Sequence, residues 1–565
     1  MKTALTFVAK NRAWIGWILL AISFLLGLLT LYWGEFVDEA DNLVVGSLLL
    51  QGQVLYRDVF SHHFPFAYYW MAGVVALAGK TIFAARFSVL LFQVASFALL
   101  MRLTRKHLLL GLTALMWGIA RPFYLGHMMI YPSFDGISLF VVFVLTLYTL
   151  QETLPPTWLH WLTIGAYSLI AFLSNPLSAY AIGITLIFLF IRKPAWELKA
   201  GTVIGVGLAL YFGALALSDS LQAFWQDVVI FNSQVYNKYT GVQPIRTLNF
   251  FSYALTGLGL PYIHWFDFDL FKPIQIGYAQ IDAWFFTGFL YRLGIIGASV
   301  LMIAQNKKTD VVASRRPERS VTKSKDGGGA TPSSDMRLLP FGYAQDKRRE
   351  GRPPRNDVLP GMYLYLFAAA TLLIAKAHYR SQAFILVAMI ALSMFALGEV
   401  RWDSVKPAMA SAGRTLRVIV LAMTLWLGVR LVGQMIHDRA DLTYDANFQK
   451  YEREANRLER LACDLPDVRL AYYPEGVYAY WFSGLQPASK YLFLWPWVAE
   501  VGQEEMIREL AEQEYVIVIV TDETVWDAYP TSDYLRPLLD YLDANYQKVG
   551  KETYLSPALF QACPP

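Results

Sequence analysis

The sequence has few cysteines and few charged residues for its length. It contains 2 Cys in 565 residues, and Asp, Glu, Lys and Arg together make up 16%, whereas a soluble globular protein carries ~25% charged residues. Hydrophobic residues make up 56%, and the mean hydropathy is +0.36. Such a chain cannot cover its apolar surface with polar groups. This excludes a cytosolic enzyme, a fibrous protein and a wholly disordered one, and predicts that part of the chain lies in lipid.

A general excess of basic residues is also missing. The net charge is +4, but residues 307–357 alone hold 13 basic and 7 acidic residues, so the rest of the chain is slightly acidic. The basic character therefore belongs to one segment, and no nucleic-acid partner is expected.

Long apolar runs dominate the remaining sequence. A hydrocarbon core of ~30 Å needs about 20 apolar residues in a helix. Runs of this kind predict a polytopic α-helical membrane protein with about 11 transmembrane helices, at 14–33, 82–101, 108–125, 136–150, 158–173, 177–191, 200–217, 284–302, 361–375, 383–397 and 418–432.

The distribution of Lys and Arg among the connections predicts the orientation. Basic residues gather at the N-terminus and in alternate connections, whereas the connection at 34–66 is rich in acids. Because cytoplasmic loops carry the excess of Lys and Arg, we expect the N-terminus inside and, with an odd number of spans, the C-terminus outside. The expected location is the cell (inner) membrane, with multiple passes.

Two domains are expected, with three long soluble segments. Residues 1–440 form the membrane domain, which includes a first outside loop at 34–66 and a large aromatic outside loop at 218–283. Residues 305–358, rich in Gly, Pro, Ser and charge, are expected to be a disordered cytoplasmic insertion.

Residues 441–565 predict an extracytoplasmic α/β domain. Buried strands are expected at 468–473 and 515–521, with helices at 447–462, 504–513 and 534–545. Both cysteines of the chain, Cys463 and Cys563, fall in this domain. In an oxidising compartment they could form a disulfide; two unpaired thiols are the alternative.

The first outside loop contains the most informative residues. Asp38 and Glu39 follow the first span, and an amphipathic run from Ala40 to Leu50 comes next. Acids at a membrane surface can simply be a solvated helix cap. Against an apolar interfacial helix, however, partial desolvation raises the pKa of a carboxylate and makes it a better base.

The order of residues in this loop resembles that of the GT-C membrane glycosyltransferases, and more narrowly the bacterial relatives of protein O-mannosyltransferase and the lipid A aminoarabinose transferase. The shared elements are an Asp-Glu pair, a helix ending in Leu-x-x-Gly, a Tyr-x-Asp and a His/Pro-containing approach to the next helix. In this chain they are Asp38-Glu39, Leu49–Gly52, Tyr56-Arg57-Asp58 and His63-Phe64-Pro65. The insertion at 305–358 has no counterpart in that pattern.

The resemblance implies an enzyme that moves a sugar, hexosyl or pentosyl, from a polyprenyl-phosphate carrier to an extracytoplasmic acceptor. That acceptor could be a glycan, a lipid or a protein, and the reaction would be an inverting single displacement. By this resemblance Asp38 is the catalytic base. Glu39 and Asp58 would orient the acceptor or a neighbouring cation, and Tyr56, His62 and His63 would also bind substrate.

The departing lipid phosphate needs cations, since negative charge develops on it. The residues that could supply or face this charge are Arg86, near the outer end of the second span, and Lys376, His378, Tyr379 and Arg380 in a short outer turn. The turn resembles a carrier-binding turn of the family, although interfacial snorkelling explains its Lys and Arg equally well. Asp135 resembles a second acid across the cavity, with a helix N-cap as the alternative.

Other motifs and classes carry less weight. Asp267 and Asp269 resemble a metal-binding Asp-x-Asp, and His62 and His63 could bind zinc together with acids, but neither pattern is specific. No cofactor is predicted with certainty, and use of a divalent cation stays open. The alternative function is a transporter or flippase of lipid-linked sugars, which would do no covalent chemistry; the sequence shows no internal repeat of the kind typical of transporters.

Overall fold

The computed structural model describes residues 2–151, 157–192, 194–240, 274–276, 279–281, 284–304, 358–375, 392–400, 405–525 and 528–564. Several sequence predictions lie wholly or partly outside the described residues. They are the insertion at 305–358 apart from its last residue, residues 241–273 of the expected 218–283 loop with the Asp267–Asp269 motif, residues 383–391 of the expected span at 383–397, and the turn that holds Lys376, His378, Tyr379 and Arg380.

Five helices of the described part are long and apolar enough to cross a membrane: α1 (Lys2–Leu29, of which Asn11–Leu29), α4 (Ile82–Thr104), α6 (Pro132–Gln151), α9 (Pro194–Leu217) and α17 (Pro407–His437). They differ in what surrounds them. The apolar window of α6 is 94% buried inside the protein, whereas that of α9 is 11% buried. An apolar helix with so little protein cover is suited to face lipid, and α6 is suited to the centre of the bundle.

Shorter apolar helices complete the bundle: α3 (Phe66–Ala78), α5 (His107–Ala120), α7 (Trp158–Ser174), α8 (Ser178–Arg192), α13 (Trp284–Ala304) and α15 (Val358–Ala375). Each expected span that lies within the described residues coincides with one of these eleven helices. The helix α3 was not predicted, because 13 apolar residues are too few for a span. The number of spans stays a prediction.

Three helical segments lie between the spans at one end of the bundle. The helix α2 (Val37–Leu50) occupies the first loop, and η1 (Arg121–Tyr124) follows α5. After α9 come α10 (Leu221–Phe224), the π-helix η2 (Trp225–Tyr236) and α11 (Asn237–Thr240), so the described start of the expected 218–283 loop is helical. A two-stranded sheet of β1 (Ile274–Ile276) and β2 (Ala279–Ile281) is also described.

The C-terminal region is built around a five-stranded sheet in the order β4-β3-β5-β9-β8. The strands β3 (Arg469–Tyr473), β4 (Gln486–Pro487) and β5 (Val516–Val520) are parallel. The strand β9 (Thr553–Leu555) pairs antiparallel with β5, and the edge strand β8 (Gln547–Lys548) pairs antiparallel with β9. All five residues of β5 are buried, as expected for a central strand. A small hairpin joins β6 (Thr524–Val525) and β7 (Tyr529–Pro530).

Helices surround this sheet: α18 (Tyr444–Ala462), α19 (Val477–Ser483), α20 (Pro496–Glu512), α21 (Thr531–Tyr534), α22 (Arg536–Asn545) and α23 (Pro557–Ala562). The predicted strands and helices match β3, β5, α18, α20 and α22, with starts shifted by up to eight residues. Cys463 at the end of α18 and Cys563 after α23 form a disulfide, with their Cα atoms 6.1 Å apart.

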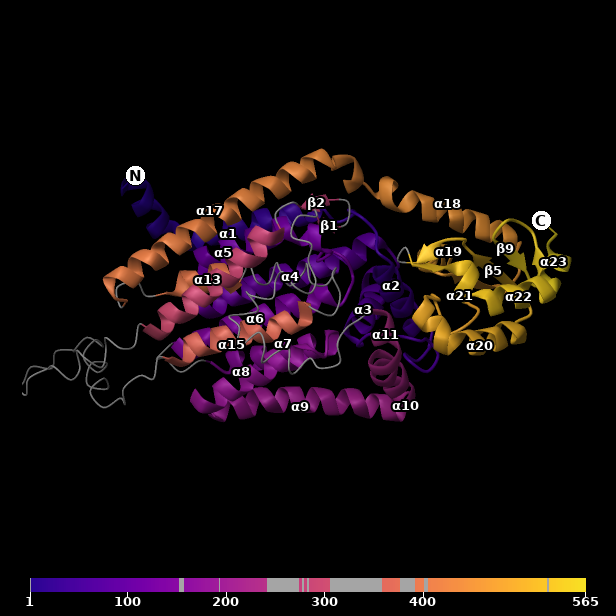
Figure 1. The fold of residues 1–565 in the computed structure, drawn as a ribbon, viewed down its shortest axis with the longest axis horizontal. Coiled ribbons are helices and arrows are strands. Elements are labelled where there is room, and N and C mark those ends of the chain that lie inside the picture. The colour runs from indigo at the N-terminus through magenta and orange to yellow at the C-terminus, as the bar shows by residue number, and fades with distance from the viewer. Residues whose placement is uncertain are drawn as a thin grey trace, which may run out of the picture.

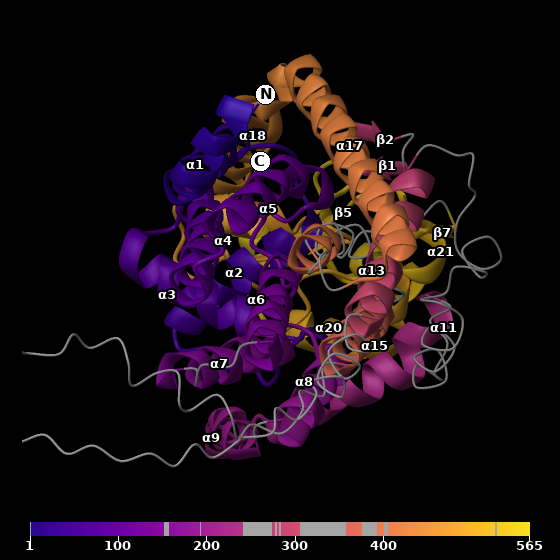
Figure 2. The same ribbon diagram turned by 90° about the vertical axis from the view of Figure 1, so that its left-hand side faces the viewer.

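The α/β region lies at the end of the bundle where α2 and α11 lie, and the N-terminus lies at the other end (Figure 1). The helix α17 runs along the bundle and leads through η5 (Arg439–Leu442) into α18. Seen from the opposite end, α6 lies among α4, α5, α7 and α8 (Figure 2). The acidic first loop and the C-terminal region therefore share one end of the molecule, as the sequence predicted.

Candidate functional site

An ion pair inside the protein fixes the start of α2. Arg86, one turn into α4, donates from Nε to Glu39 Oε1 at 2.8 Å and from Nη2 to Glu39 Oε2, and neither side chain is exposed (0% each). Arg86 also donates to the backbone oxygens of Leu31 and Gly34, which form the connection between α1 and α2. One arginine thus ties together the end of α1, the start of α2 and α4.

Glu39 accepts two further hydrogen bonds. The backbone N–H of Met129 donates to Oε1 at 2.9 Å, and the hydroxyl of Tyr478 in α19 donates to Oε2 at 3.0 Å. The sequence predicted that Glu39 orients the sugar acceptor or a cation, and that Arg86 faces the phosphate of the lipid carrier. In the structure each of these two charges is buried against the other, and the described contacts of both side chains are to protein atoms. The substrate roles of Glu39 and Arg86 stay predictions.

Asp38 and Asp41 lie next to this anchor on one face of α2. Asp38 is half-buried, and its backbone oxygen accepts from Asn42 Nδ2 at 2.5 Å. Asp41 is three residues further along, the spacing that brings two side chains together on a helix. Burial, with the neighbouring Asp38 charge adding to it, raises the pKa of Asp41 to about 7. The N-terminal part of α2 therefore holds one half-exposed carboxylate near a buried one that titrates near neutrality.

Hydrogen bonds connect Asp41 to the loop before α3. The hydroxyl of Tyr68 donates to Asp41 Oδ2 at 2.5 Å and lies 2.6 Å from Ser61 Oγ. Ser61 Oγ in turn accepts from the backbone N–H of His63 at 3.1 Å. Asp41 Oδ1 has no hydrogen-bond partner among the described residues. A buried carboxylate oxygen of this kind can bind a proton or accept a hydrogen bond from a substrate hydroxyl.

The two adjacent histidines have different surroundings. The ring of His63 is half-exposed and lies against Tyr131, with centroids 5.2 Å apart. His62 is buried between Phe231 and Tyr236 of η2, at 5.6 and 5.2 Å. His63 is therefore the one with access to the space beside α2. His62 joins the first loop to η2, which differs from the substrate-contact role expected from the sequence.

Tyr56 and Asp58 both make contacts within the first loop. Asp58 Oδ2 accepts from the backbone N–H of Val54 at 2.8 Å, and Arg57 pairs with Asp58 Oδ1 at 2.8 Å, which lowers the pKa of Asp58. Tyr56 is fully buried and donates to the backbone oxygen of His63 at 3.0 Å. These contacts hold the turn that leads to His63, and the substrate-binding roles of both residues stay predictions.

Asp135 lies inside the first turn of α6, which begins at Pro132, so it is not the N-cap residue that the sequence allowed. It is 2% exposed, and its Oδ2 accepts from Asn175 Nδ2 at the end of α7 at 3.0 Å. Its Oδ1 finds no hydrogen-bond partner in the described part of the chain. The expected role as a second acid of the site stays a prediction.

Metal binding was left open by the sequence. Among the described residues no group of three or more His, Cys, Asp or Glu side chains is arranged to hold an ion. Asp41 and Asp38 alone offer too few ligands for a site built entirely by protein side chains. A cation requirement remains a matter for experiment.

Comparisons with known proteins give a distant similarity in fold. No protein-family model matches the chain, and no curated protein matches its sequence. Among solved structures, ArnT from Cupriavidus metallidurans in the apo state matches 98% of this chain and 100% of its own length, with 11% identity and a TM-score of 0.44. The same protein bound to undecaprenyl phosphate matches 96% of this chain and 99% of its own length, at 12% identity and a TM-score of 0.45.

The archaeal oligosaccharyltransferase AglB from Archaeoglobus fulgidus, in complex with an inhibitory peptide and a dolichol-phosphate, matches 90% of this chain and 70% of its own length. The identity is 11% and the TM-score is 0.41. These neighbours are glycosyltransferases of the superfamily that the first-loop motif resembles. With TM-scores below 0.5, the likenesses by themselves assign neither an activity nor a substrate to this chain.

Sequence reasoning missed several residues of this region. Tyr478 lies 439 residues from Glu39, and nothing in the sequence pairs them. Tyr68 lies in α3, a helix that the sequence did not predict. Asp41 was visible, since its spacing of three from Asp38 on an expected helix places both carboxylates on one face.

Proposed function

We propose that the chain is a membrane glycosyltransferase that moves a sugar from a polyprenyl-phosphate carrier to a hydroxyl or phosphate acceptor. The observation that carries this proposal is the N-terminal part of α2, where half-exposed Asp38 lies near buried Asp41 on a helix fixed by the buried Glu39–Arg86 pair. The ordered motifs of the first loop, which resemble the GT-C glycosyltransferases, support the same reading.

In the proposed reaction Asp38 accepts the proton of the acceptor hydroxyl. The acceptor oxygen attacks the anomeric carbon of the sugar while the bond from that carbon to the phosphate oxygen breaks, so the electron pair leaves with the polyprenyl phosphate and the configuration inverts. A carboxylate held in position contributes to such a step because proton transfer needs a base within hydrogen-bond reach. Buried Asp41, with its pKa of about 7, and Tyr68 form the second layer behind Asp38.

The departing phosphate needs positive charge or hydrogen-bond donors. Of the residues predicted to supply them, Arg86 pairs with Glu39, and Lys376, His378, Tyr379 and Arg380 lie outside the described residues. We therefore add His63, which the sequence predicted only as a substrate-binding residue. In this proposal the half-exposed ring of His63, which lies against Tyr131, donates to a phosphate oxygen. The carrier is therefore proposed to enter beside His63.

The C-terminal residues 441–565 are proposed to form an extracytoplasmic domain that covers the site and contributes to acceptor recognition. It contacts α2 directly, because Tyr478 donates a hydrogen bond to Glu39, the neighbour of Asp38. It also contacts the first loop, where the backbone N–H of Phe60 donates to the backbone oxygen of Lys490 at 2.9 Å.

The test is a transfer assay on membranes that contain the protein, supplied with an isotopically labelled polyprenyl-phosphate sugar. Wild-type protein is expected to give labelled product, detected by mass spectrometry, and Asp38→Asn is expected to abolish it. The matched control is Asp445→Asn, an exposed acid in the first turn of α18, which should leave transfer unchanged. Equal amounts of folded protein in the membrane are confirmed by size-exclusion chromatography.

A transporter or flippase would behave differently in the same assay. It would move the labelled lipid-linked sugar between leaflets with its phosphodiester bond intact, and the Asp38 variant would give no change in covalent products. Labelled product that persists in Asp38→Asn would reject Asp38 as the base.

A further inference from the structure

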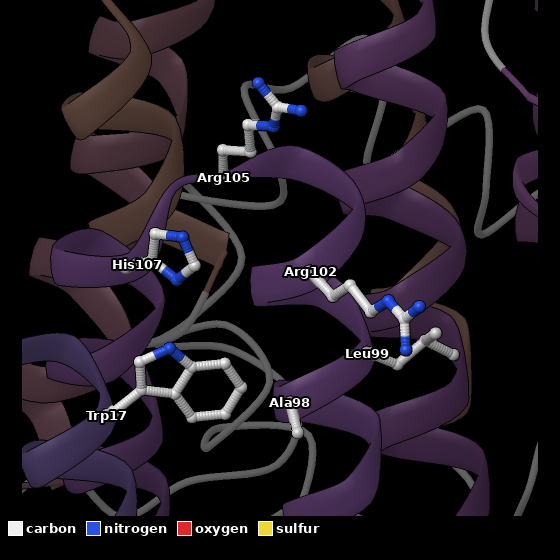
Figure 3. Close-up of a pocket in the computed structure, with 6 residues that line it drawn as sticks. All are labelled: Trp17, Ala98, Leu99, Arg102, Arg105 and His107. Carbon is white, nitrogen blue, oxygen red and sulfur yellow. The ribbon is translucent and has the colours of Figure 1, made fainter. Parts of the chain in front are cut away.

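A groove of about 620 Å³ lies at the opposite end of α4 from Arg86. It is lined by Trp17 of α1, by Ala98, Leu99 and Arg102 of α4, and by Arg105 and His107 at the junction of α4 and α5, which ring one space in Figure 3. At ~1.5 Å per helical residue, Arg102 lies about 24 Å from Arg86 along the helix. In a core of ~30 Å this puts the groove near the other membrane surface.

The groove exists because α1 and α5 approach each other closely. A Cβ atom on Gly16 would lie 2.3 Å from the backbone oxygen of His107, and one on Gly111 would lie 2.7 Å from Gly16 Cα. Only glycine permits this approach at both positions. It brings the ring of Trp17 to 5.9 Å from that of His107, so an aromatic side chain forms the floor beside a titratable one.

Positive charge at the rim is not neutralised within the described part of the chain. Arg102 and Arg105 are both exposed, and no carboxylate of the described residues pairs with either; the neighbouring Lys106 does pair, with Glu399 at 2.9 Å. Nδ1 of His107 is buried and has no hydrogen-bond partner among the described residues. His107 also begins α5, and the N-terminus of a helix favours an anion.

We propose that this groove binds one anionic phospholipid of the leaflet opposite the C-terminal domain. The phosphate of the head group lies between Arg102, Arg105 and His107, and the acyl chains follow the apolar wall of Ala98 and Leu99. Trp17 sits at head-group level, the depth that tryptophan prefers at a membrane surface. Clusters of basic residues between membrane helices recognise anionic head groups in this way. The site is separate from Asp38. A lipid bound there would fix the depth of the helical bundle in the membrane.

The test uses photocrosslinking in bilayers of phosphatidylcholine and phosphatidylglycerol in equal amounts. The photoreactive residue benzoylphenylalanine replaces Leu99 in the groove, or Leu91, an exposed apolar residue of the same helix that serves as the matched control. Crosslinked lipids are identified by mass spectrometry. At Leu99 the expected ratio of phosphatidylglycerol to phosphatidylcholine is about tenfold, and at Leu91 it equals the ratio in the bilayer.

Variants of the two arginines then test whether the lipid enrichment at Leu99 depends on their positive charge or on the shape of the groove. Arg102→Gln with Arg105→Gln is expected to abolish the enrichment at Leu99, whereas Arg102→Lys with Arg105→Lys should keep most of it. Arg192→Gln, which changes a half-exposed arginine at the end of α8, should leave it unchanged. Thermal unfolding of each variant checks that the fold is intact, and Asp38-dependent transfer should be unaffected because the two sites are far apart.

Three results would overturn the proposal: equal labelling of the two lipids at Leu99, enrichment that survives both Arg→Gln changes, and enrichment that inorganic phosphate removes. The last would assign the groove to free phosphate instead of a lipid head group. Crosslinking of an added polyprenyl phosphate in preference to phosphatidylglycerol would also reject it, in favour of a second carrier site.

Discussion

The two ends of α4 use arginine in opposite ways. At the end under the C-terminal region, Arg86 is fully buried and its guanidinium is used by Glu39 and by backbone oxygens of the α1–α2 connection. At the other end, Arg102 and Arg105 are exposed beside an apolar groove. The same residue type thus fixes a helix where water is excluded and stays exposed at the other end, where we propose that it binds a lipid head group.

The difference also bears on where catalysis can occur. A base must be held in a constant position, and the buried pair holds α2 from several directions at once. The exposed end has no comparable network in the described residues. Covalent chemistry is therefore expected at the end covered by the C-terminal region, and lipid recognition at the open end.

The largest effect on stability is expected from breaking the buried pair. Arg86→Met leaves the Glu39 carboxylate buried without its partner, which costs about 3–5 kcal/mol. Replacing both partners, as Arg86→Met with Glu39→Met, should cost less than either single change. Unfolding in detergent measures these values. The exposed pair of Arg57 and Asp58 is the control: Arg57→Met should cost about 1 kcal/mol or less. Equal losses at the two pairs would show that Arg86 does not anchor α2.

A smaller, pH-dependent effect is expected at Asp41. Its pKa is raised to about 7 in the folded protein, from 3.8 for an aspartate in water. The folded state therefore binds the proton more tightly. The resulting stability is fully present below the unfolded pKa and is lost as the pH rises through about 7. Asp41→Asn should remove this dependence and stabilise the protein above that pH, as measured by unfolding across the pH range. An unchanged pH profile in the variant would contradict the assignment.

Tyr478→Phe is expected to have the smallest effect. It removes one hydrogen bond to a charged group, worth about 1.5–3 kcal/mol, and leaves the ring in place. Because Tyr478 reaches Asp38 only through Glu39, kcat should fall severalfold while KM for the lipid-linked donor stays constant. Tyr451→Phe, whose ring lies 4.6 Å from that of Tyr478, serves as the control. A change in KM alone would instead point to a role in binding.

The elements that the sequence predicted are those with a strong local pattern. The apolar residues of α4 and α6 form long runs, and all five residues of β5 are apolar and buried. Asp38 and its helix were visible for the same reason, since an ordered set of motifs lies within one short loop. Local patterns of this kind need no knowledge of distant contacts.

The contacts that decide the roles of individual residues were not predictable in this way. Glu39 and Arg86 are 47 residues apart, and Tyr478 comes from a separate part of the chain. From the sequence, Glu39 and Arg86 were interpreted as substrate ligands, and Tyr478 was given no role. Their burial and their pairing exist only in the folded protein. His62 and His63 are neighbours in sequence, yet only the fold shows that one is enclosed by η2 and the other is half-exposed.

The most direct test of the central claim is the stoichiometry of a single turnover. Purified protein in bilayers is mixed with a labelled polyprenyl-phosphate sugar and a membrane extract as the acceptor source, and free polyprenyl phosphate and labelled product are counted together by mass spectrometry. Sugar transfer predicts the two in equal amounts for the wild type and neither for Asp38→Asn. Recovery of the intact lipid-linked sugar on the opposite side of the bilayer, with no polyprenyl phosphate released, would contradict it.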